Sequence, residues 1–182
     1  MADSVQKRPP CTGDRAPEFE FTSPDTKRVR SSDLLGKGPI LLTFYRGAWC
    51  TCCQSDLRDL KRAMPAIRRT GATVLGVFYQ LGPDANARIV SDYALDFPLV
   101  DDVGGRAAEA FGIRRSASEL ARIENEFGPE MLALKESEPW MLPMQARFVI
   151  GNDGVVAHSE VISNYGERSD ANGLIPVLEG LR

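Results

Sequence analysis

The stretch Ile40-Leu41-Leu42-Thr43-Phe44-Tyr45 is a short apolar run, and the cluster Cys50-Thr51-Cys52-Cys53 follows it closely. Such a run is typical of a strand that is buried on both faces of a sheet. From Cys53 to about Arg69 the apolar residues recur at spacings of three and four, which indicates one face of an amphipathic helix. The residues on this face are Leu57, Leu60, Met64 and Ile67. The cysteine cluster is therefore expected where a buried strand gives way to a helix.

The remaining sequence alternates between predicted strands and helices. Residues 18–22 alternate polar and apolar side chains and predict a strand, with a hairpin return at 27–30 and one helical turn at 31–36. Pro65 is expected to kink the long helix or to end it early. Downstream, the patterns predict a strand at 72–79, a helix at 83–94, a strand at 97–100, a helix at 104–111, an inserted helical segment within 114–141, a strand at 146–150 with a hairpin return at 155–159, and a final helix at 170–181.

This order of elements predicts the fold class. The early alternation of strands and helices implies a parallel portion with crossover helices, and the late hairpin adds antiparallel strands. We therefore expect an α/β thioredoxin-like fold, with a mixed central sheet flanked by helices, an N-terminal hairpin and a helical insertion. Residues 1–15 are polar and carry no periodicity, so they are predicted to be a mobile N-terminal arm. Residues 16–182 then form the thioredoxin-like domain.

Composition narrows the class of function. The 182 residues are 43% hydrophobic and 26% charged, which suits one soluble domain, and the formal net charge of −3 lacks the basic excess of nucleic-acid-binding proteins. No segment approaches the ~18–20 apolar residues that span a bilayer, and residues 1–8 lack the apolar core of a secretory signal. We therefore expect a cytoplasmic protein that binds neither nucleic acid nor membrane.

Three of the four cysteines lie within the cluster at the strand-to-helix junction. Unpaired N–H groups and the positive end of the helix dipole stabilise a thiolate there and lower its pKa. Cys50 and Cys53 stand in C-x-x-C spacing, which brings two sulfurs on a first helical turn within reach of each other. One thiol can then attack a substrate while the other resolves the product. The alternatives are soft-metal binding by the thiols or purely structural cysteines.

Several stretches carry a family resemblance. Residues 45–53 read Y-R-G-A-W-C-T-C-C, and residues 13–19 read G-D-R-A-P-E-F. Residues 97–102 read F-P-L-V-D-D, and residues 146–154 contain R-F-V-I followed by D-G. Together they resemble the peroxiredoxin-like branch of the alkyl hydroperoxide reductase/thiol-specific antioxidant family, over roughly residues 13–180. The resemblance implies a thioredoxin fold and thiol-dependent reduction of peroxides or disulfides.

The chain departs from the family's peroxidase motif, P-x-x-x-[TS]-x-x-C. Counting back from Cys53, Cys50 stands in place of the Thr and Arg46 in place of the Pro. Gln145 stands where peroxidases carry an Arg and thioredoxin-like reductases a cis-Pro, and Thr51 replaces the Pro of C-P-x-C. Exposure at the helix tip favours Cys50 as the attacking thiol in disulfide exchange. Alignment with the peroxidase motif favours Cys53 as the attacking thiol for peroxide.

The residues around the pair have expected roles. Cys50, Cys53, Arg46 and Trp49 are the candidate catalytic residues: the fixed charge of Arg46 would lower a thiolate pKa, and Trp49 would pack beside the pair and shape access to it. Cys52 is a candidate auxiliary thiol, with the alternatives of a sideways-pointing small residue or a third metal ligand.

Two further residues of chemically reactive types, a cysteine and a histidine, lie outside the expected catalytic set. Cys11 lies on the predicted arm, where it is expected to do nothing or to form a late or intermolecular disulfide. His158 is the only histidine and is expected to be a surface or packing residue rather than a ligand.

Three hypotheses remain at this point. A peroxidase would form a cysteine sulfenic acid and then a Cys50–Cys53 disulfide, which an external thiol reductant, such as a thioredoxin-type protein or glutathione, would reduce. A thioredoxin-like reductase would attack a protein disulfide through Cys50. A non-catalytic thiol module would bind a soft metal or a partner. The first is preferred, with no cofactor and no metal, and a homodimer is compatible with the resemblance.

Overall fold

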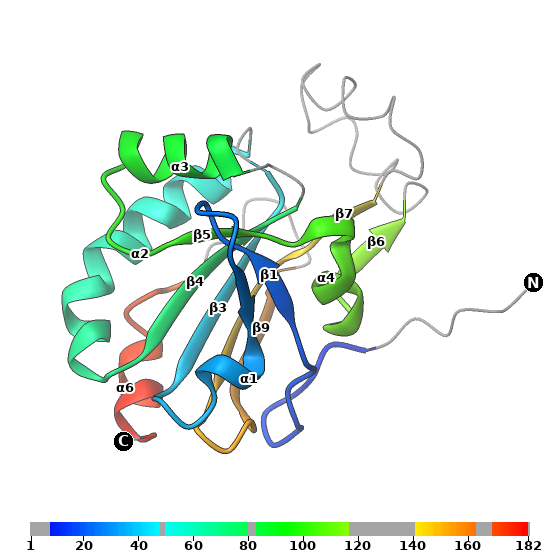
Figure 1. The fold of residues 1–182 in the computed structure, drawn as a ribbon. Coiled ribbons are helices and arrows are strands. Elements are labelled where there is room, and N and C mark those ends of the chain that lie inside the picture. The colour runs from blue at the N-terminus through cyan, green and yellow to red at the C-terminus, as the bar shows by residue number, and fades with distance from the viewer. Residues whose placement is uncertain (1–7, 48–49, 80–82, 117–140, 163–168, 182) are drawn as a thin grey trace, which may run out of the picture.

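A computed structural model describes residues 8–47, 50–79, 83–116, 141–162 and 169–181 (Figure 1). The elements, in chain order, are β1 (Glu20–Thr22), β2 (Arg28–Arg30), α1 (Ser31–Leu34), β3 (Ile40–Tyr45), α2 (Thr51–Arg69), β4 (Thr73–Phe78), α3 (Pro83–Asp92), β5 (Leu99–Asp101), the 3-10 turn η1 (Val103–Gly105), α4 (Arg106–Ala110), β6 (Arg114–Ser116), β7 (Met141–Pro143), β8 (Gln145–Ile150), β9 (Val156–Ile162) and α6 (Leu174–Glu179).

The central sheet has seven strands in the order β2-β1-β5-β4-β3-β8-β9. Strands β3, β4 and β5 are parallel neighbours, and β8 pairs antiparallel with β3, with Leu42 opposite Phe148. Strand β9 returns from β8 as a hairpin, and β1 and β2 form the N-terminal hairpin. The expected mixed sheet, with its parallel centre and antiparallel additions, is confirmed.

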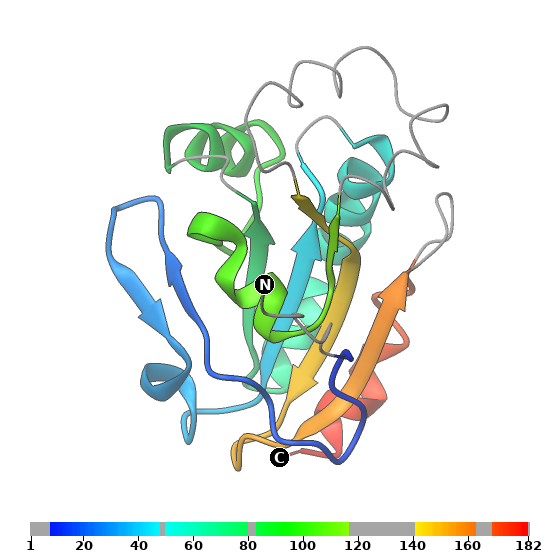
Figure 2. The same ribbon diagram turned by 90° about the vertical axis from the view of Figure 1, so that its right-hand side faces the viewer.

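Helices cover both faces of this sheet. Helices α2, α3 and α6 lie on one side of the sheet, and α4 lies on the other side (Figures 1 and 2). Phe19 and Phe21, at and just before β1, belong to the same apolar cluster as α4. Strand β3 serves both layers, because Leu41 and Tyr45 face the α2 side while Leu42 and Phe44 face the α4 side. All residues of β3 are buried, as expected for an apolar strand in a parallel sheet.

Helix α2 continues through Pro65 to Arg69, so the proline does not end it. Pro65 itself is exposed, whereas Met64 and Ile67 on either side are buried against the sheet. Burial of a large apolar side chain contributes about 1.5–3 kcal/mol. The burial of these two side chains offsets the loss of the one backbone hydrogen bond that the proline cannot donate.

Two regions add to what the patterns predict. Strands β6 and β7 pair antiparallel as a small separate sheet, which their sequences do not announce. Residues 117–140, which hold most of the helical segment expected within 114–141, lie outside the described residues, as do residues 1–7 of the predicted arm. Close to the predicted boundary between the N-terminal arm and the domain, two backbone hydrogen bonds join the chain to Val156. The Gly13 amide donates to the Val156 carbonyl at 2.8 Å, and the Val156 amide donates to the Asp14 carbonyl at 2.9 Å.

A buried ion pair joins α2 to the sheet. Nη2 of Arg147, on β8, donates to both carboxylate oxygens of Asp56 at 2.7 Å, and both side chains are almost fully buried. The Tyr45 hydroxyl donates to the same carboxylate at 2.8 Å. Gly76 of β4 leaves room for the neighbouring Leu99 side chain, because a Cβ there would stand 2.5 Å from it. The carboxylate is thus bound by three directional hydrogen bonds in the core.

Removing one member of this pair should destabilise the fold strongly. Asp56→Ala would leave the Arg147 guanidinium buried without its counter-ion, and such a loss costs about 3–5 kcal/mol. Asp59→Ala is the matched control on the same helix, because Asp59 pairs with Arg62 in an exposed contact at 2.8 Å. The control should lose no more than about 1 kcal/mol. Urea unfolding of the reduced proteins measures both; a similar small loss in the two variants would contradict the buried pair's role.

Candidate active site

The cysteine cluster lies where the carboxyl end of β3 leads into α2 (Figure 1). Cys50 is the N-cap residue, with an extended backbone at φ −74° and ψ 110°. Its Sγ accepts the backbone N–H of Cys53 at 3.3 Å, and its carbonyl accepts the Gln54 amide at 3.0 Å. A thiol therefore occupies the place where a serine or aspartate oxygen usually caps a helix. The N–H groups of the first turn favour the ionised form of that thiol.

The two thiols of the C-x-x-C pair have opposite tendencies to ionise. A hydrogen bond from the Cys53 side chain, together with the Cys53 backbone N–H and the Arg46 guanidinium, outweighs desolvation and lowers the pKa of Cys50 to about 6. Burial, followed by the nearby Cys50 sulfur, raises the pKa of Cys53 well above its usual range. At neutral pH Cys50 is therefore the thiolate and Cys53 the protonated thiol.

Arg46 lies beside this pair. Its side chain is buried, and its Nη2 donates to the Ile162 carbonyl at the end of β9 at 3.4 Å. The same guanidinium acts on the Cys50 sulfur through its charge and a hydrogen bond. Because the planar group stays charged at all working pH values, it provides a fixed positive charge at the thiolate.

The other candidate residues are placed differently. Cys52 is half-buried and packs against the core under α2. Cys11 is exposed near the start of β9, at the opposite end of that strand from Ile162, where its sulfur accepts from Arg8 at 3.3 Å. His158 pairs with Val149 within the β8–β9 hairpin, away from the cluster. Trp49 lies outside the described residues.

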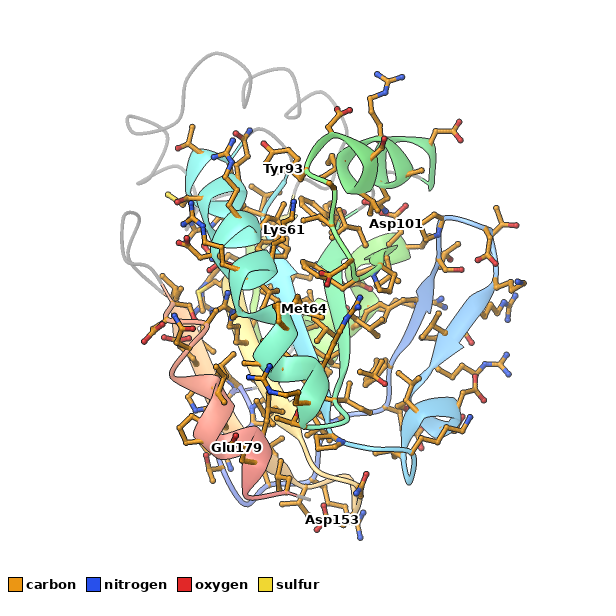
Figure 3. All side chains as sticks on the ribbon, turned by 90° about the vertical axis from the view of Figure 1, so that its left-hand side faces the viewer. Lys61, Met64, Tyr93, Asp101, Asp153 and Glu179 are labelled. Carbon is orange, nitrogen blue, oxygen red and sulfur yellow. The ribbon has the colours of Figure 1, made fainter. Side chains whose placement is uncertain are left out.

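A small apolar pocket borders Cys53 on the side of α3. Its lining residues are Gly47, Cys53, Gln54, Leu57, Phe78, Ile89 and Tyr93. Two contacts hold Tyr93 against α2. Lys61 donates to the Tyr93 carbonyl at 2.9 Å (Figure 3). The Arg58 guanidinium lies 5.0 Å from the centre of the Tyr93 ring. The Cys53 thiol is thus covered by protein but adjoins a space between two helices.

Sequence patterns do not single out the polar residues beneath the pair. Tyr45, Asp56 and Arg147 stand at positions that the periodicity assigns to the buried side of a strand or helix. The available signal was a carboxylate on the apolar face of one helix and a cation within an apolar strand. Asp56 is held one helical turn beyond Cys53, and burial raises the pKa of its carboxyl against the opposing effect of Arg147.

Two findings on the described residues concern metal binding and membrane insertion. Within residues 8–47, 50–79, 83–116, 141–162 and 169–181, no three His, Cys, Asp or Glu side chains converge as metal ligands would. In the same ranges, no helix is both long enough and apolar enough to cross a membrane.

Comparisons with known proteins identify relatives of this site and fold. The model of the AhpC/TSA family matches residues 12–159. The thiol-disulfide oxidoreductase ResA of Bacillus thuringiensis subsp. konkukian is 28% identical over 101 residues, which are 56% of this chain and 57% of that protein. A Mycobacterium tuberculosis protein named as a peroxiredoxin is 31% identical over 109 residues, covering 57% of this chain and 67% of the relative. The chain therefore spans little more than half the length of the ResA proteins it matches.

Solved structures resemble the whole fold. The peroxidoxin BcpB from Mycobacterium tuberculosis superposes with a TM-score of 0.73 at 22% identity, covering 95% of this chain and 99% of that chain. A peroxiredoxin-like protein from Aquifex aeolicus has a TM-score of 0.70 at 18% identity, covering 94% of this chain and 87% of that one. These similarities confirm the thioredoxin-like fold.

The pKa of Cys50 can be measured from its alkylation rate. With Cys11 and Cys52 replaced by serine, the reduced protein should react with iodoacetamide along a sigmoid in pH centred near 6. The rate should fall below that pH, because protonation removes the nucleophilic thiolate. Cys53→Ala should move the midpoint to higher pH, since it removes the main hydrogen bond to the thiolate, whereas Cys53→Ser keeps a donor and should move it less. A midpoint near 9 in the parent protein would contradict the assignment.

Proposed function

Because the chain belongs to the AhpC/TSA family, we propose that it is a thiol-dependent oxidoreductase that reduces peroxides, with Cys50 attacking and Cys53 resolving. The observation that carries this proposal is the environment of Cys50. Its sulfur caps α2, accepts the Cys53 N–H at 3.3 Å and lies beside the buried Arg46 guanidinium. Cys53, one helical turn further, is protonated and protected.

The first step is attack on the peroxide. The Cys50 thiolate forms a bond to the terminal oxygen of R–O–O–H, and the O–O bond breaks. The sulfur becomes a sulfenic acid and is oxidised by two electrons, while the alkoxide leaves with the bonding pair and takes a proton from water. The Arg46 guanidinium is placed to stabilise the negative charge as it moves from sulfur to the leaving oxygen, which is the role of a preorganised donor.

The second step closes the disulfide. The Cys53 thiol attacks the Cys50 sulfenic acid, the S–O bond breaks, and water leaves with the Cys53 proton and the hydroxyl. The spacing on one helical turn places the two sulfurs near each other, and the raised pKa of Cys53 keeps it protonated until this step. An external thiol reductant, of the thioredoxin or glutathione kind, would then return both cysteines to thiols. Operation in the cytoplasm and assembly as a homodimer remain parts of the same proposal.

A second candidate function is reduction of a disulfide. The same Cys50 thiolate would attack one sulfur of the substrate, and Cys53 would displace the mixed disulfide. The match to the ResA proteins, which are named as thiol-disulfide oxidoreductases, favours this candidate.

Peroxide kinetics test the first candidate. The reduced protein should lose thiols to hydrogen peroxide at least about a hundredfold faster than a small thiol with the same ionised fraction, because one preorganised donor is worth about 10²–10³ in rate. Cys50→Ser should abolish this fast phase. Cys53→Ser should keep it and stop at a Cys50 sulfenic acid that dimedone traps. Arg46→Met should slow it while leaving Cys50 in place.

The control is Cys52→Ser, which should react like the parent protein. Rates no faster than those of the small thiol would remove the peroxidase proposal and leave disulfide exchange. Fast oxidation that survives in Cys50→Ser and vanishes in Cys53→Ser would show that the attacking cysteine has been assigned wrongly.

A further inference from the structure

Gln145, the first residue of β8, has a buried side-chain oxygen with no hydrogen-bond donor among the described residues. The residue is 1% exposed, and its Oε1 is out of contact with solvent. Leaving such an acceptor unsatisfied destabilises the folded state, so buried polar atoms in folded proteins nearly always have a partner. A partner that arrives with the substrate would supply the missing donor.

The strand geometry places this side chain level with the start of α2, where the thiol pair lies. Gln145 and Arg147 share one face of β8, and Arg147 reaches Asp56 of α2 on that face. Gln145 stands about 6–7 Å further along the strand, toward the end where α2 begins. Cys53 precedes Asp56 by three residues, or about 4.5 Å along the helix in the same direction. Gln145 is therefore level with the first turn of α2.

The same position is next to Arg46. Gln145 pairs with Ile162 across the β8–β9 hairpin, and the Ile162 carbonyl accepts Nη2 of Arg46 at 3.4 Å. The end of the sheet beside Cys50 thus presents one fixed cation and one unsatisfied acceptor. The cation suits a developing negative oxygen, whereas the acceptor requires a group that carries hydrogen.

We propose that Oε1 of Gln145 accepts the O–H of the hydroperoxide during attack by Cys50, which makes Gln145 a substrate-binding residue that favours hydroperoxides over disulfides. This inference rests on the proposed peroxidase function. The hydrogen stays on the attacked oxygen, which becomes the O–H of the sulfenic acid. The other oxygen departs with the electron pair of the broken O–O bond and takes a proton from water. A disulfide has no hydrogen on its reacting atoms and gains nothing from this acceptor.

The test compares three reagents on one variant. Gln145→Met has a similar shape and no acceptor oxygen. Its reaction with hydrogen peroxide should be about fivefold slower than that of the parent, the value of one neutral hydrogen bond. Its reactions with iodoacetamide and with an aromatic disulfide reagent should be unchanged. Gln145→Ala removes the same atoms with a smaller group and should give the same pattern if the methionine variant folds poorly.

Thr43→Val is the matched control. Thr43 is buried, lies on the same sheet face opposite Arg147, and also has an Oγ1 without a partner among the described residues. This variant should react like the parent with all three reagents. An unchanged peroxide rate in both Gln145 variants, or an equal slowing with all three reagents, would overturn the assignment of Gln145. Slow peroxide oxidation of the parent itself would instead remove the peroxidase function on which the assignment rests.

Discussion

The position of Cys50 at the N-cap of α2, with Cys53 one turn further inside the helix, determines the chemistry of the site, because the side chain and the backbone N–H of Cys53 both donate to the Cys50 sulfur. As the N-cap, Cys50 receives the first-turn hydrogen bonds and the positive end of the helix dipole, and both favour its thiolate. Cys53, inside the first turn, is turned into the core and loses its solvation. The same few residues thus produce one ionised and one protonated thiol, as a two-step redox cycle requires.

The helix can hold this geometry because a polar contact fixes it to the sheet. Asp56 receives the Arg147 guanidinium and the Tyr45 hydroxyl one turn beyond Cys53. Arg147 in turn donates to the Ser169 hydroxyl at 2.6 Å, which donates to Glu160 of β9. These hydrogen bonds are directional, whereas the apolar contacts of α2 would tolerate small sliding along the sheet. The buried pair therefore sets the position of the helix start relative to β3.

Local patterns were sufficient to predict the parts of this arrangement that depend on near neighbours. The apolar run of β3 and the three-and-four spacing of Leu57, Leu60, Met64 and Ile67 predicted the strand, the helix and the thiols between them. The pairing of Asp56 with Arg147 joins residues separated by 91 positions, and no local pattern encodes it. Local patterns do not identify the ionised cysteine for the same reason, since its identity depends on how deeply the fold buries Cys53. Strands β6 and β7 are too short to show a periodicity, and only their mutual pairing defines them.

The redox cycle that we propose uses Cys50 and Cys53 and leaves Cys52 aside. Tandem mass spectrometry identifies which cysteines are joined, on reduced protein treated with one equivalent of hydrogen peroxide and then with an alkylating reagent under denaturing conditions. We expect a Cys50–Cys53 disulfide, with the alkyl label on Cys52 and Cys11. A disulfide that includes Cys52, or a dimer linked through Cys11, would contradict it.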